Sequence, residues 1–562
     1  MEVAPAIRPL KSDIILLSAF ASIVLLIHFV SGNGYGFHRD ELQFLDDARH
    51  LQWGYTAYPP LTAFAGRVAI ALFGISPQAF RFPNALVSAL SLGLLGLLAR
   101  ELGGRRPAQL LALFAGLPVA FLLSSVLQYN TFDYFAWGLM ALFTAYLLRT
   151  GDERFWIGVG TAAGIGVLSK YSIAFPIVSL VAALLLLPSQ RRHLRSRWFY
   201  FGALTALLIA SPNLVWLVRH HFITLQMEHF IHLRDIRIGR AQNYFSGQIP
   251  FALLALPLAI AGLVSLLRSR RFRLLSAYYI GPLLLFALVK GRSYYMLPGY
   301  IVLYAAGSVA CERFLAARRK WLRIAFAGLI LVAMLTDATL FAALSTPIAH
   351  PGSPFWNWQM AKNPVLLDEI GWPQFVADVA HVRDNLAPSE RVHMAVLAEN
   401  YGEAGALALY GPAYGLPTPI SDVNSFHDRG FGPFPSENVI VTGGDYDALL
   451  QQFESCRLAG HVHIPYGVQN EESVDHADIL VCHHLRRPWS EVWPEAQHFA
   501  GLHTHAWRES AWGESADRRW THGRTSRPAT FSATCVAGRN PRRFCVMGGP
   551  SGCHFTMPVS LG

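Results

Sequence analysis

Long apolar runs recur along the first 345 residues, and they constrain the fold more than any other feature of this chain. A helix needs about 20 apolar residues to cross the roughly 30 Å hydrocarbon layer of a membrane. With 53% hydrophobic and 15% charged residues, the chain is too apolar for an ordinary soluble protein. We therefore predict a polytopic α-helical membrane protein with about eleven transmembrane helices, at residues 13–30, 82–99, 108–126, 132–148, 155–168, 171–188, 199–218, 250–267, 274–289, 295–311 and 322–344.

Basic residues are concentrated in every second connection between these runs. They give a net charge of +10, but they do not gather on one polar domain, so no nucleic-acid partner is expected. By the positive-inside rule, the basic connections are cytoplasmic. The other connections, and everything after residue 345, are then expected outside the cytoplasm, beyond a plasma (inner) membrane. The first run is expected to remain as an anchor, because no small-residue cleavage motif follows it.

The composition changes near residue 345, where prolines and tryptophans mark a linker and the apolar runs become short. Helical and strand patterns alternate beyond it. Helices are expected at residues 365–385, 403–410 and 446–456, and strands at 391–398, 438–441 and 478–482. The predicted regions are a transmembrane domain (1–345), an extracytoplasmic soluble α/β domain (346–500) and a disordered tail (501–562).

The first loop predicted to face outward contains an acidic motif, HRDELQFLDDARH (residues 38–50). Holding charged side chains beside a membrane is costly, so the motif favours a chemical role. Asp40 is a candidate general base that takes a proton from an acceptor hydroxyl, with Glu41 assisting it or ordering the loop. The structural alternative makes Asp40 the N-cap of a helix over residues 41–51, because Asp is a favoured capping residue.

Further candidates lie where other predicted helices reach the same side of the membrane. Asp133, in the motif NTFDYF, is costly at this position without a partner or ligand, and the alternative is that it caps the fourth helix. Asp40 and Asp133 are expected on one face of the membrane, where they could converge. A second set of residues is suited to binding a phosphate or lining a substrate cavity, and comprises Arg49, Tyr58, Lys170, Lys290, Arg292, Tyr294 and Tyr295. The structural alternative is that the basic residues snorkel to the membrane surface and that the tyrosines belong to an interfacial aromatic belt.

Patterns typical of metal or cofactor sites are weak. Glu228 and His232 are four residues apart, but they belong to a basic and aromatic segment (residues 219–245) that is suited to covering a lipid groove at the membrane interface. The six cysteines have no metal-type spacing. Cys456 and Cys482 could form a disulfide or remain free thiols. No metal ligands and no cofactor are predicted, and a divalent metal requirement is left open.

The order of several motifs resembles a known family. The first-loop motif is followed by FRFPNALVSAL (residues 80–90), NTFDYFAW, LSKYS and KGRSYYMLPGY. This series is similar to bacterial membrane glycosyltransferases of the C-type fold (glycosyltransferase family 39), which include protein O-mannosyltransferases and lipid A aminoarabinose transferases, and the likeness covers about residues 10–500. It implies that Asp40 is the catalytic acid residue of the first loop, that Glu41 completes the acidic pair, and that Asp133 is the second acidic residue.

One position departs from the family pattern. The family often has Lys before the paired prolines of the first loop, where this chain has Tyr58. The departure leaves the donor phosphate short of one cation. Lys170, Lys290 or Arg292 would therefore have to contribute more to phosphate binding.

The resemblance implies transfer of a hexose or pentose from a polyprenyl-phosphate donor to a lipid, glycan or protein acceptor outside the cytoplasm, with inversion at the anomeric carbon. Lys and Arg would stabilise the charge that the departing phosphate gains. The alternative is a membrane transporter or lipid-sugar flippase, which should show polar sites near the midplane and internal symmetry. Most polar candidates instead lie on one face, and Asp337 is the exception within a helix. A non-catalytic scaffold would leave the Asp40/Asp133 pair unexplained.

Overall fold

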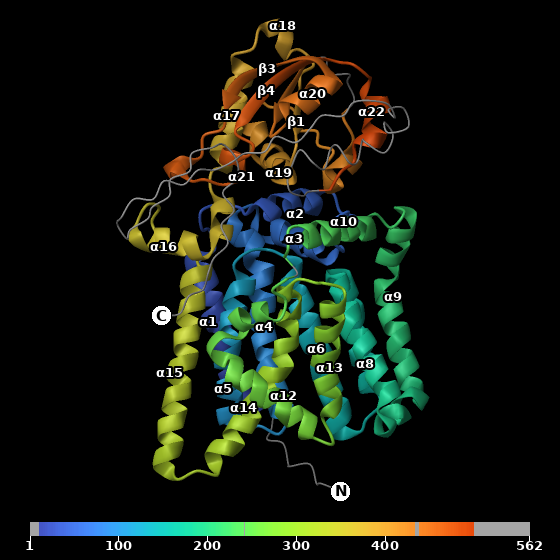
Figure 1. Ribbon diagram of the computed structural model, residues 1–562, viewed down its shortest axis with the longest axis vertical. Coiled ribbons are helices and arrows are strands. Elements are labelled where there is room, and N and C mark those ends of the chain that lie inside the picture. Colours follow the sequence, from blue (N-terminus) through green and yellow to red (C-terminus); the bar gives the residue numbers. More distant parts are fainter. Residues whose placement is uncertain (1–10, 241, 433–437, 500–562) are drawn as a thin grey trace, which may run out of the picture. The chain divides into compact units, whose positions relative to one another are not determined.

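Long helices dominate the first 345 residues of the computed structural model, which describes residues 11–240, 242–432 and 438–499 (Figure 1). The predicted tail, 501–562, lies outside the described residues. All eleven apolar runs named above are helical over most of their length. The helices of this part are α1 (Lys11–Ser31), α2 (Arg39–Arg49), α3 (Leu61–Phe73), α4 (Pro77–Glu101), α5 (Arg106–Ser124), α6 (Tyr129–Thr150), α7 (Phe155–Ser169), α8 (Ala174–Leu186), α9 (Arg197–Arg219), α10 (Ile223–Arg237), α11 (Ile249–Ala252), α12 (Leu256–Arg268), α13 (Arg273–Leu288), α14 (Tyr300–Ala316) and α15 (Lys320–Ser345).

Eight helices in the described part of the chain are long and apolar enough to cross a membrane. A ninth span results if Tyr171–Leu186 is taken together with Pro188–Arg195, from which it is bent by 110°. The chain is therefore a multi-pass membrane protein. Two of the predicted spans, α7 and α13, have only 15 and 16 residues, so eleven crossings stay a prediction.

Small residues allow several of these helices to pack backbone against backbone. A Cβ on Gly160 of α7 would lie 1.9 Å from the carbonyl oxygen of Gly202 on α9. A Cβ on Gly262 of α12 would lie 2.0 Å from the carbonyl oxygen of Leu303 on α14. Close approach through glycine is the usual basis of helix association in lipid, where the hydrophobic effect gives no preference for helix contact.

The C-terminal part contains one four-stranded sheet (Figure 1). Its strands β1 (Ala395–Ala398), β2 (Asn438–Thr442), β3 (Phe453–His461) and β4 (Asp478–Leu485) are ordered β1-β2-β4-β3. β1 and β2 are parallel, whereas β4 is antiparallel to both of its neighbours. The helices after residue 345 are α16 (Pro354–Lys362), α17 (Trp372–Asp384), α18 (Pro388–Arg391), α19 (Tyr401–Tyr410), α20 (Tyr446–Gln452), α21 (Glu471–Val474) and α22 (Trp489–Ala496). We call residues 372–496, which contain the sheet and helices α17 to α22, the sheet domain.

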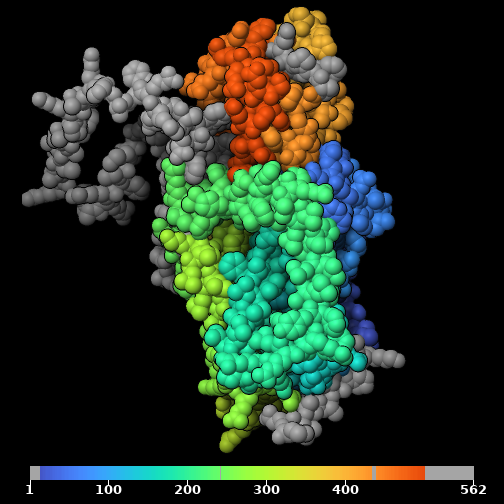
Figure 2. Space-filling view, turned by 90° about the vertical axis from the view of Figure 1, so that its right-hand side faces the viewer, coloured from blue at the N-terminus to red at the C-terminus, as the bar shows by residue number. Residues whose placement is uncertain are grey.

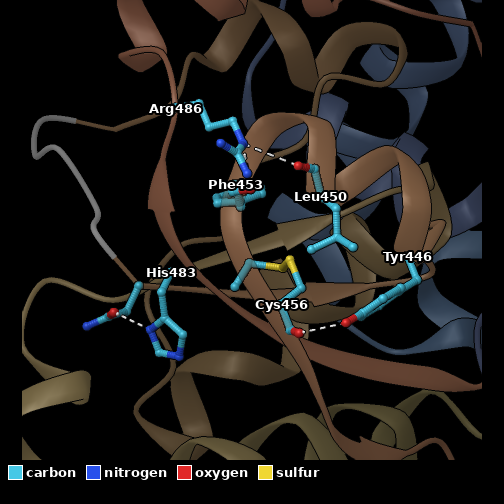
Figure 3. Close-up of a disulfide and its surroundings, with 8 residues drawn as sticks. Tyr446, Leu450, Phe453, Cys456, His483 and Arg486 are labelled. Carbon is cyan, nitrogen blue, oxygen red and sulfur yellow. Dashed lines mark hydrogen bonds between the residues drawn. A yellow bond between two sulfur atoms is a disulfide. The ribbon is translucent and has the colours of Figure 1, made fainter.

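The predicted helices and strands after residue 345 are present, but several bounds differ. The strand expected over 391–398 is only Ala395–Ala398, because Arg391 ends α18. The helix expected over 365–385 is a 3-10 helix at Pro364–Glu369 and becomes α-helical at Trp372. The helix expected over 446–456 ends at Gln452, and the edge strand β3 begins at Phe453. The helical prediction for residues 453–456 was wrong because backbone pairing with β4 overrides the local pattern. Cys456 and Cys482 lie directly opposite each other on β3 and β4 and form a disulfide (Figure 3). Of the two predicted alternatives, the disulfide is therefore correct and the free thiols are not.

Helices α2, α3 and α10 lie between the membrane helices and the sheet domain in Figure 1. The apolar face of α2, with Leu42 and Leu45, belongs to the same buried cluster as Phe375 of α17 and Val396 and Val481 of the sheet. The first loop and the sheet domain therefore share one hydrophobic core, although about 330 to 440 residues separate them.

Candidate active site

Helix α2 begins one residue before Asp40, and its cap is His38. The backbone N–H of Asp40 donates to Nδ1 of His38 (3.1 Å), and the backbone N–H of His38 donates to Oε2 of Glu41 (2.9 Å). This reciprocal pair is a capping box. The alternative prediction that Asp40 caps the helix is therefore wrong. Asp40 lies in the first turn and is partly exposed, so its carboxylate remains accessible.

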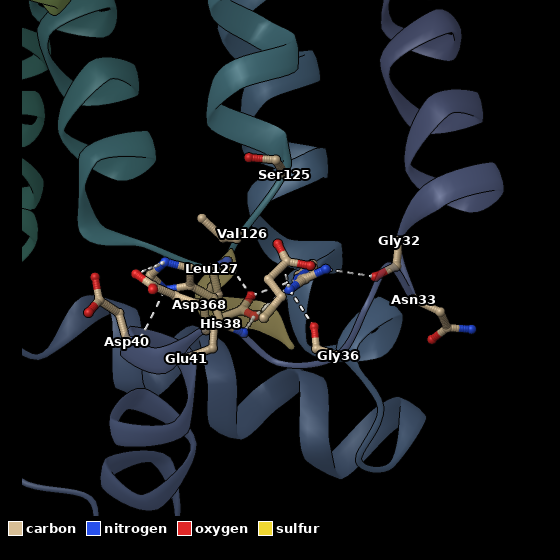
Figure 4. Close-up of polar contacts among 12 residues, drawn as sticks. Gly32, Asn33, Gly36, His38, Asp40, Glu41, Ser125, Val126, Leu127 and Asp368 are labelled. Atoms are coloured by element: carbon tan, nitrogen blue, oxygen red, sulfur yellow. Dashed lines mark hydrogen bonds and ion pairs between the residues drawn. The ribbon is translucent and has the colours of Figure 1, made fainter. Parts of the chain in front are cut away.

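The side chain of Glu41 is fully buried and its carboxylate is surrounded by donors (Figure 4). Arg81 of α4 donates to it through Nε (2.9 Å) and Nη2 (2.7 Å), and the backbone N–H of Leu127 donates to Oε1 (2.7 Å). Arg81 is also fully buried, and lies 3.4 Å from Glu369. Of the two roles predicted for Glu41, this arrangement favours ordering the loop over assisting the reaction.

Tyr58 lies in the core rather than at a cavity. Its side chain is 2% exposed, and its hydroxyl donates to Oδ2 of Asp47 at 2.6 Å. Asp47 also accepts a hydrogen bond from Ser425 (2.7 Å) and pairs with Arg429 (2.6 Å) of the sheet domain. Burial raises the pKa of Asp47, although Arg429 opposes this shift. Tyr58 thus supports the position of α2.

Three motifs that are far apart in the sequence converge on Lys170, which directly follows α7. Its Nζ donates to Oδ1 of Asn130 (2.8 Å) and lies 5.2 Å from the ring centre of Tyr129, 5.1 Å from that of Tyr294 and 4.4 Å from that of Tyr295. Such distances allow cation–π attraction to all three rings. We call these five residues the Lys170 cage. Its tyrosines face a cation, which an interfacial belt does not require.

Arg292 stands beside the cage but is already paired. It forms an ion pair with Asp235 of α10 (Nη2 to Oδ1, 3.0 Å), and its Nη1 lies 3.4 Å from the hydroxyl of Tyr294. Burial acts against ionisation of Asp235, but the hydrogen bonds and charge of Arg292 outweigh it and lower the pKa of Asp235. Lys290 is exposed after the end of α13.

Arg49 lies at the other end of α2 from Asp40. Its Nη1 is 3.5 Å from the carbonyl oxygen of Ala408 in α19. Within the described residues, Arg49 and Lys290 therefore have no contact with the Lys170 cage, whereas Arg292 touches it through Tyr294.

Asp133 lies inside α6, which begins at Tyr129 after its cap Gln128, so the capping alternative is wrong for this residue too. Its carboxylate accepts hydrogen bonds from Nε1 of Trp137 (3.1 Å) and from Oγ of Ser172 (2.9 Å). Ser172 is two residues beyond Lys170, so Asp133 fixes the turn that carries the cage lysine. No contact between Asp133 and Asp40 is present in the described part of the chain.

Tyr129 joins the cage to the first loop. Its hydroxyl interacts electrostatically with Asp40, Glu228 and Arg292, and its ring is 6.1 Å from that of Tyr58. Tyr129 could not be predicted from the sequence, because a tyrosine at a helix start carries no signal of its own. Glu228 is exposed on α10 and interacts electrostatically with Lys170 and Arg292.

Among the described residues, no group of three or more His, Cys, Asp or Glu side chains is arranged to hold a metal ion.

Tyr401 is a second residue of the site that carries no sequence signal. Its hydroxyl donates to Oδ1 of Asp40 at 2.8 Å, across 361 residues of sequence. Tyr401 lies in the segment ENYGEAGALALYGPAYGLP (residues 399–417). A single sequence gives no signal for such a pairing, because it depends on how α19 packs against α2.

Comparison with known proteins supports the resemblance to membrane glycosyltransferases. Residues 57–216 match the family described as dolichyl-phosphate-mannose-protein mannosyltransferase. The chain is 29% identical over 217 residues to the lipopolysaccharide core galacturonosyltransferase RgtA of Rhizobium johnstonii, covering 38% of this chain and 43% of the relative. The predicted resemblance to C-type membrane glycosyltransferases is confirmed. The lipid A galacturonosyltransferase RgtD of the same organism is 27% identical over 220 residues, 38% of this chain and 46% of the relative.

The chain spans less than half the length of these two relatives. A solved structure gives broader coverage of the fold. ArnT from Cupriavidus metallidurans, in the apo state, superposes with a TM-score of 0.51 over 84% of this chain and 98% of that one, at 16% identity. The likeness confirms the class of fold, which is a bundle of membrane helices with a small C-terminal sheet domain.

Proposed function

We propose that this protein is a glycosyltransferase that moves a sugar from a polyprenyl-phosphate donor to an acceptor on the extracytoplasmic side of the plasma membrane. The proposal rests on two groups that Tyr129 links: Asp40, which interacts electrostatically with Tyr129, and Lys170, whose Nζ lies 5.2 Å from the ring centre of Tyr129. A carboxylate that can take a proton and a cation that can bind a phosphate are the two groups that this transfer needs.

The cage supplies the phosphate site. The only direct hydrogen bond of Lys170 within the described residues goes to a neutral amide oxygen, so its charge is available to a phosphate. Arg292 is neutralised by Asp235 and acts mainly by holding Tyr294. Lys170 therefore replaces the family lysine whose place Tyr58 takes.

The reaction follows from these positions. The acceptor hydroxyl attacks the anomeric carbon from the side opposite the phosphate, and Asp40 takes the hydroxyl proton as the new bond forms. The bond between the anomeric carbon and the phosphate oxygen breaks, so the configuration is inverted. The phosphodiester becomes a monoester with additional negative charge, which Lys170 stabilises.

A lipid donor fits the surface of the membrane part. Figure 2 shows this face hollowed below α10 and beside α9. The polyprenyl chain would lie in the membrane at this hollow and extend its phosphate to the cage, with α10 covering the site. In this proposal residues 1–345 form the transmembrane domain, and residues 346–500 form a soluble domain outside the cytoplasm.

The names of the two curated relatives suggest which class of acceptor to test first. Both curated relatives are named as galacturonosyltransferases, one of the lipopolysaccharide core and one of lipid A. We infer a glycolipid acceptor of the lipopolysaccharide type and a uronic acid as the first sugar to test. Mannose and a protein acceptor form the second choice, because the matching family is described by that activity.

The test is transfer of labelled sugar by the purified protein. Donors are polyprenyl phosphates that carry galacturonic acid, mannose or a pentose, and acceptors are lipid A, core lipopolysaccharide and envelope protein. Asp40→Asn should abolish most transfer, whereas Asp384→Asn, a matched change at an exposed residue of α17, should leave it unchanged. Equal transfer by all three proteins would remove Asp40 from the reaction. Absence of transfer by the wild type with every donor would favour the transporter alternative.

A further inference from the structure

The sheet domain packs against α2 along the length of that helix. A flexible linker to the membrane part would be enough if this domain only bound an acceptor. One buried hydrophobic cluster runs through both. Polar contacts add to it at both ends of the helix. They pair Asp40 with Tyr401, Arg39 with Glu471, Gln43 with Asn424 and Ser425, Asp47 with Ser425, and Asp46 and Asp47 with Arg429.

Two glycines bring α19 into direct contact with α2. A Cβ on Gly402 would lie 2.3 Å from Cγ of Arg39, and a Cβ on Gly405 would lie 2.7 Å from the backbone of Leu42. Residues three apart share one face of a helix, so these glycines form a smooth strip against which α2 packs. Without this strip α19 would stand further away, and a tyrosine could not reach the carboxylate of Asp40.

The position of Tyr401 is itself fixed from both sides. Asn400 caps α19 by accepting a hydrogen bond from the backbone N–H of Glu403 (2.9 Å), which sets the first turn of the helix. The guanidinium of Arg39 lies over the Tyr401 ring, 5.3 Å from its centre, and is held by Glu471. The hydroxyl then has one acceptor, Oδ1 of Asp40.

We propose that Tyr401 is a positioning residue for Asp40, so that the sheet domain completes the catalytic site of the membrane part. The inference rests on the function proposed above. The Tyr401 hydroxyl holds Oδ1 and leaves Oδ2 directed to the acceptor hydroxyl. A base held in one rotamer loses less freedom when the acceptor binds, which favours the chemical step over substrate binding.

The test combines Tyr401→Phe with a matched control on the same helix. Tyr401→Phe removes only the hydroxyl and keeps the ring under Arg39. Tyr410→Phe makes the same change at the other end of α19, where no hydrogen bond of the hydroxyl is found within the described residues. Loss of a hydrogen bond to a charged group should lower the kcat of Tyr401→Phe by about 10- to 100-fold. KM for the donor should change by less than about twofold, and Tyr410→Phe should behave as wild type.

A double-mutant cycle shows whether Tyr401 acts through Asp40. On the Asp40→Asn background, adding Tyr401→Phe should cause no further loss of the residual transfer. An equal loss on both backgrounds, an effect on KM alone, or a similar loss in Tyr410→Phe would overturn the positioning role. If wild type transfers sugar and Tyr401→Phe equals it, this inference fails and the proposed function stands. If Asp40→Asn transfers as well as wild type, the proposed role of Asp40 fails first.

Discussion

Replacing Glu41 by Gln should destabilise the protein, whereas the same kind of change at Asp40 should not. Glu41 and Arg81 form a fully buried pair, and four donor groups point at the Glu41 carboxylate. Gln keeps the size of the side chain but offers a single acceptor oxygen, and its own N–H groups would face donors. At least two of the four donors would then lose their acceptor.

The expected magnitude follows from these contacts. A hydrogen bond to a charged group contributes about 1.5–3 kcal/mol, so losing two costs about 3–6 kcal/mol. Breaking a buried ion pair by removing one partner costs about 3–5 kcal/mol. Glu369 remains 3.4 Å from Arg81 and is relieved of repulsion from Glu41, which favours the lower end. We expect a loss of about 3 kcal/mol in the free energy of unfolding.

The measurement is the unfolding of wild type and the Glu41→Gln and Asp40→Asn variants in mixed micelles, titrated with sodium dodecyl sulfate and followed by tryptophan fluorescence. Asp40→Asn is the matched control, because Asp40 is partly exposed and makes one side-chain hydrogen bond to the sheet domain. It should lose transfer activity while it changes the free energy of unfolding by less than about 1.5 kcal/mol. A stable Glu41→Gln protein that is inactive would refute the reasoning, since it would place Glu41 in the reaction rather than in the scaffold.

Three further outcomes are expected. Lys170→Gln should lower kcat/KM for the donor by about 10- to 100-fold, because the phosphate loses a charged partner, whereas Lys290→Gln at an exposed site should change it by less than about twofold. Reduction of the disulfide between β3 and β4 should destabilise the sheet domain by about 3 kcal/mol, measured as faster cleavage of that domain by trypsin. The stability of the sheet domain should also fall with rising pH. Burial opposes the shift, but hydrogen bonding and the charge of Glu403 raise the pKa of His476 from 6.5 to about 9, so the stabilisation is complete below pH 6.5 and is lost as pH rises to about 9. Burial raises the pKa of Glu472 from 4.5 to about 7, which causes a separate loss between those values. His476→Gln should flatten only the upper part of the unfolding curve between pH 5 and 9, and an unchanged slope above pH 6.5 would contradict the assignment.

The membrane part could be predicted because its main determinant is local. A long apolar run satisfies its own backbone hydrogen bonds as a helix, whatever it packs against. Lys170, Tyr294 and Tyr295 lie near the ends of predicted helices and meet in one cage, whereas their role in substrate binding stays a prediction.

The details that failed depend on packing. His38 caps α2 in place of Asp40 because its ring nitrogen reaches the first turn, a choice that residue preferences do not favour. Strand β3 follows α20 without a break, and only its pairing with β4 distinguishes it from a continued helix. The contact of Tyr401 with Asp40 depends on two glycines of α19. In each case the deciding partner lies outside the local window that a sequence pattern samples.

The acidic pair of the first loop illustrates this limit most clearly. Asp40 and Glu41 are adjacent, and on a helix adjacent side chains point about 100° apart. The two carboxylates therefore face different neighbours: Glu41 faces Arg81 of α4, and Asp40 faces Tyr401 of the sheet domain. The position of Arg81, 40 residues further along the chain, makes Glu41 the buried member. The same turn of helix leaves Asp40 partly exposed and within hydrogen-bond distance of the Tyr401 hydroxyl. A sequence shows two acids, and the direction of the helix assigns one to the scaffold and the other to the proposed chemistry.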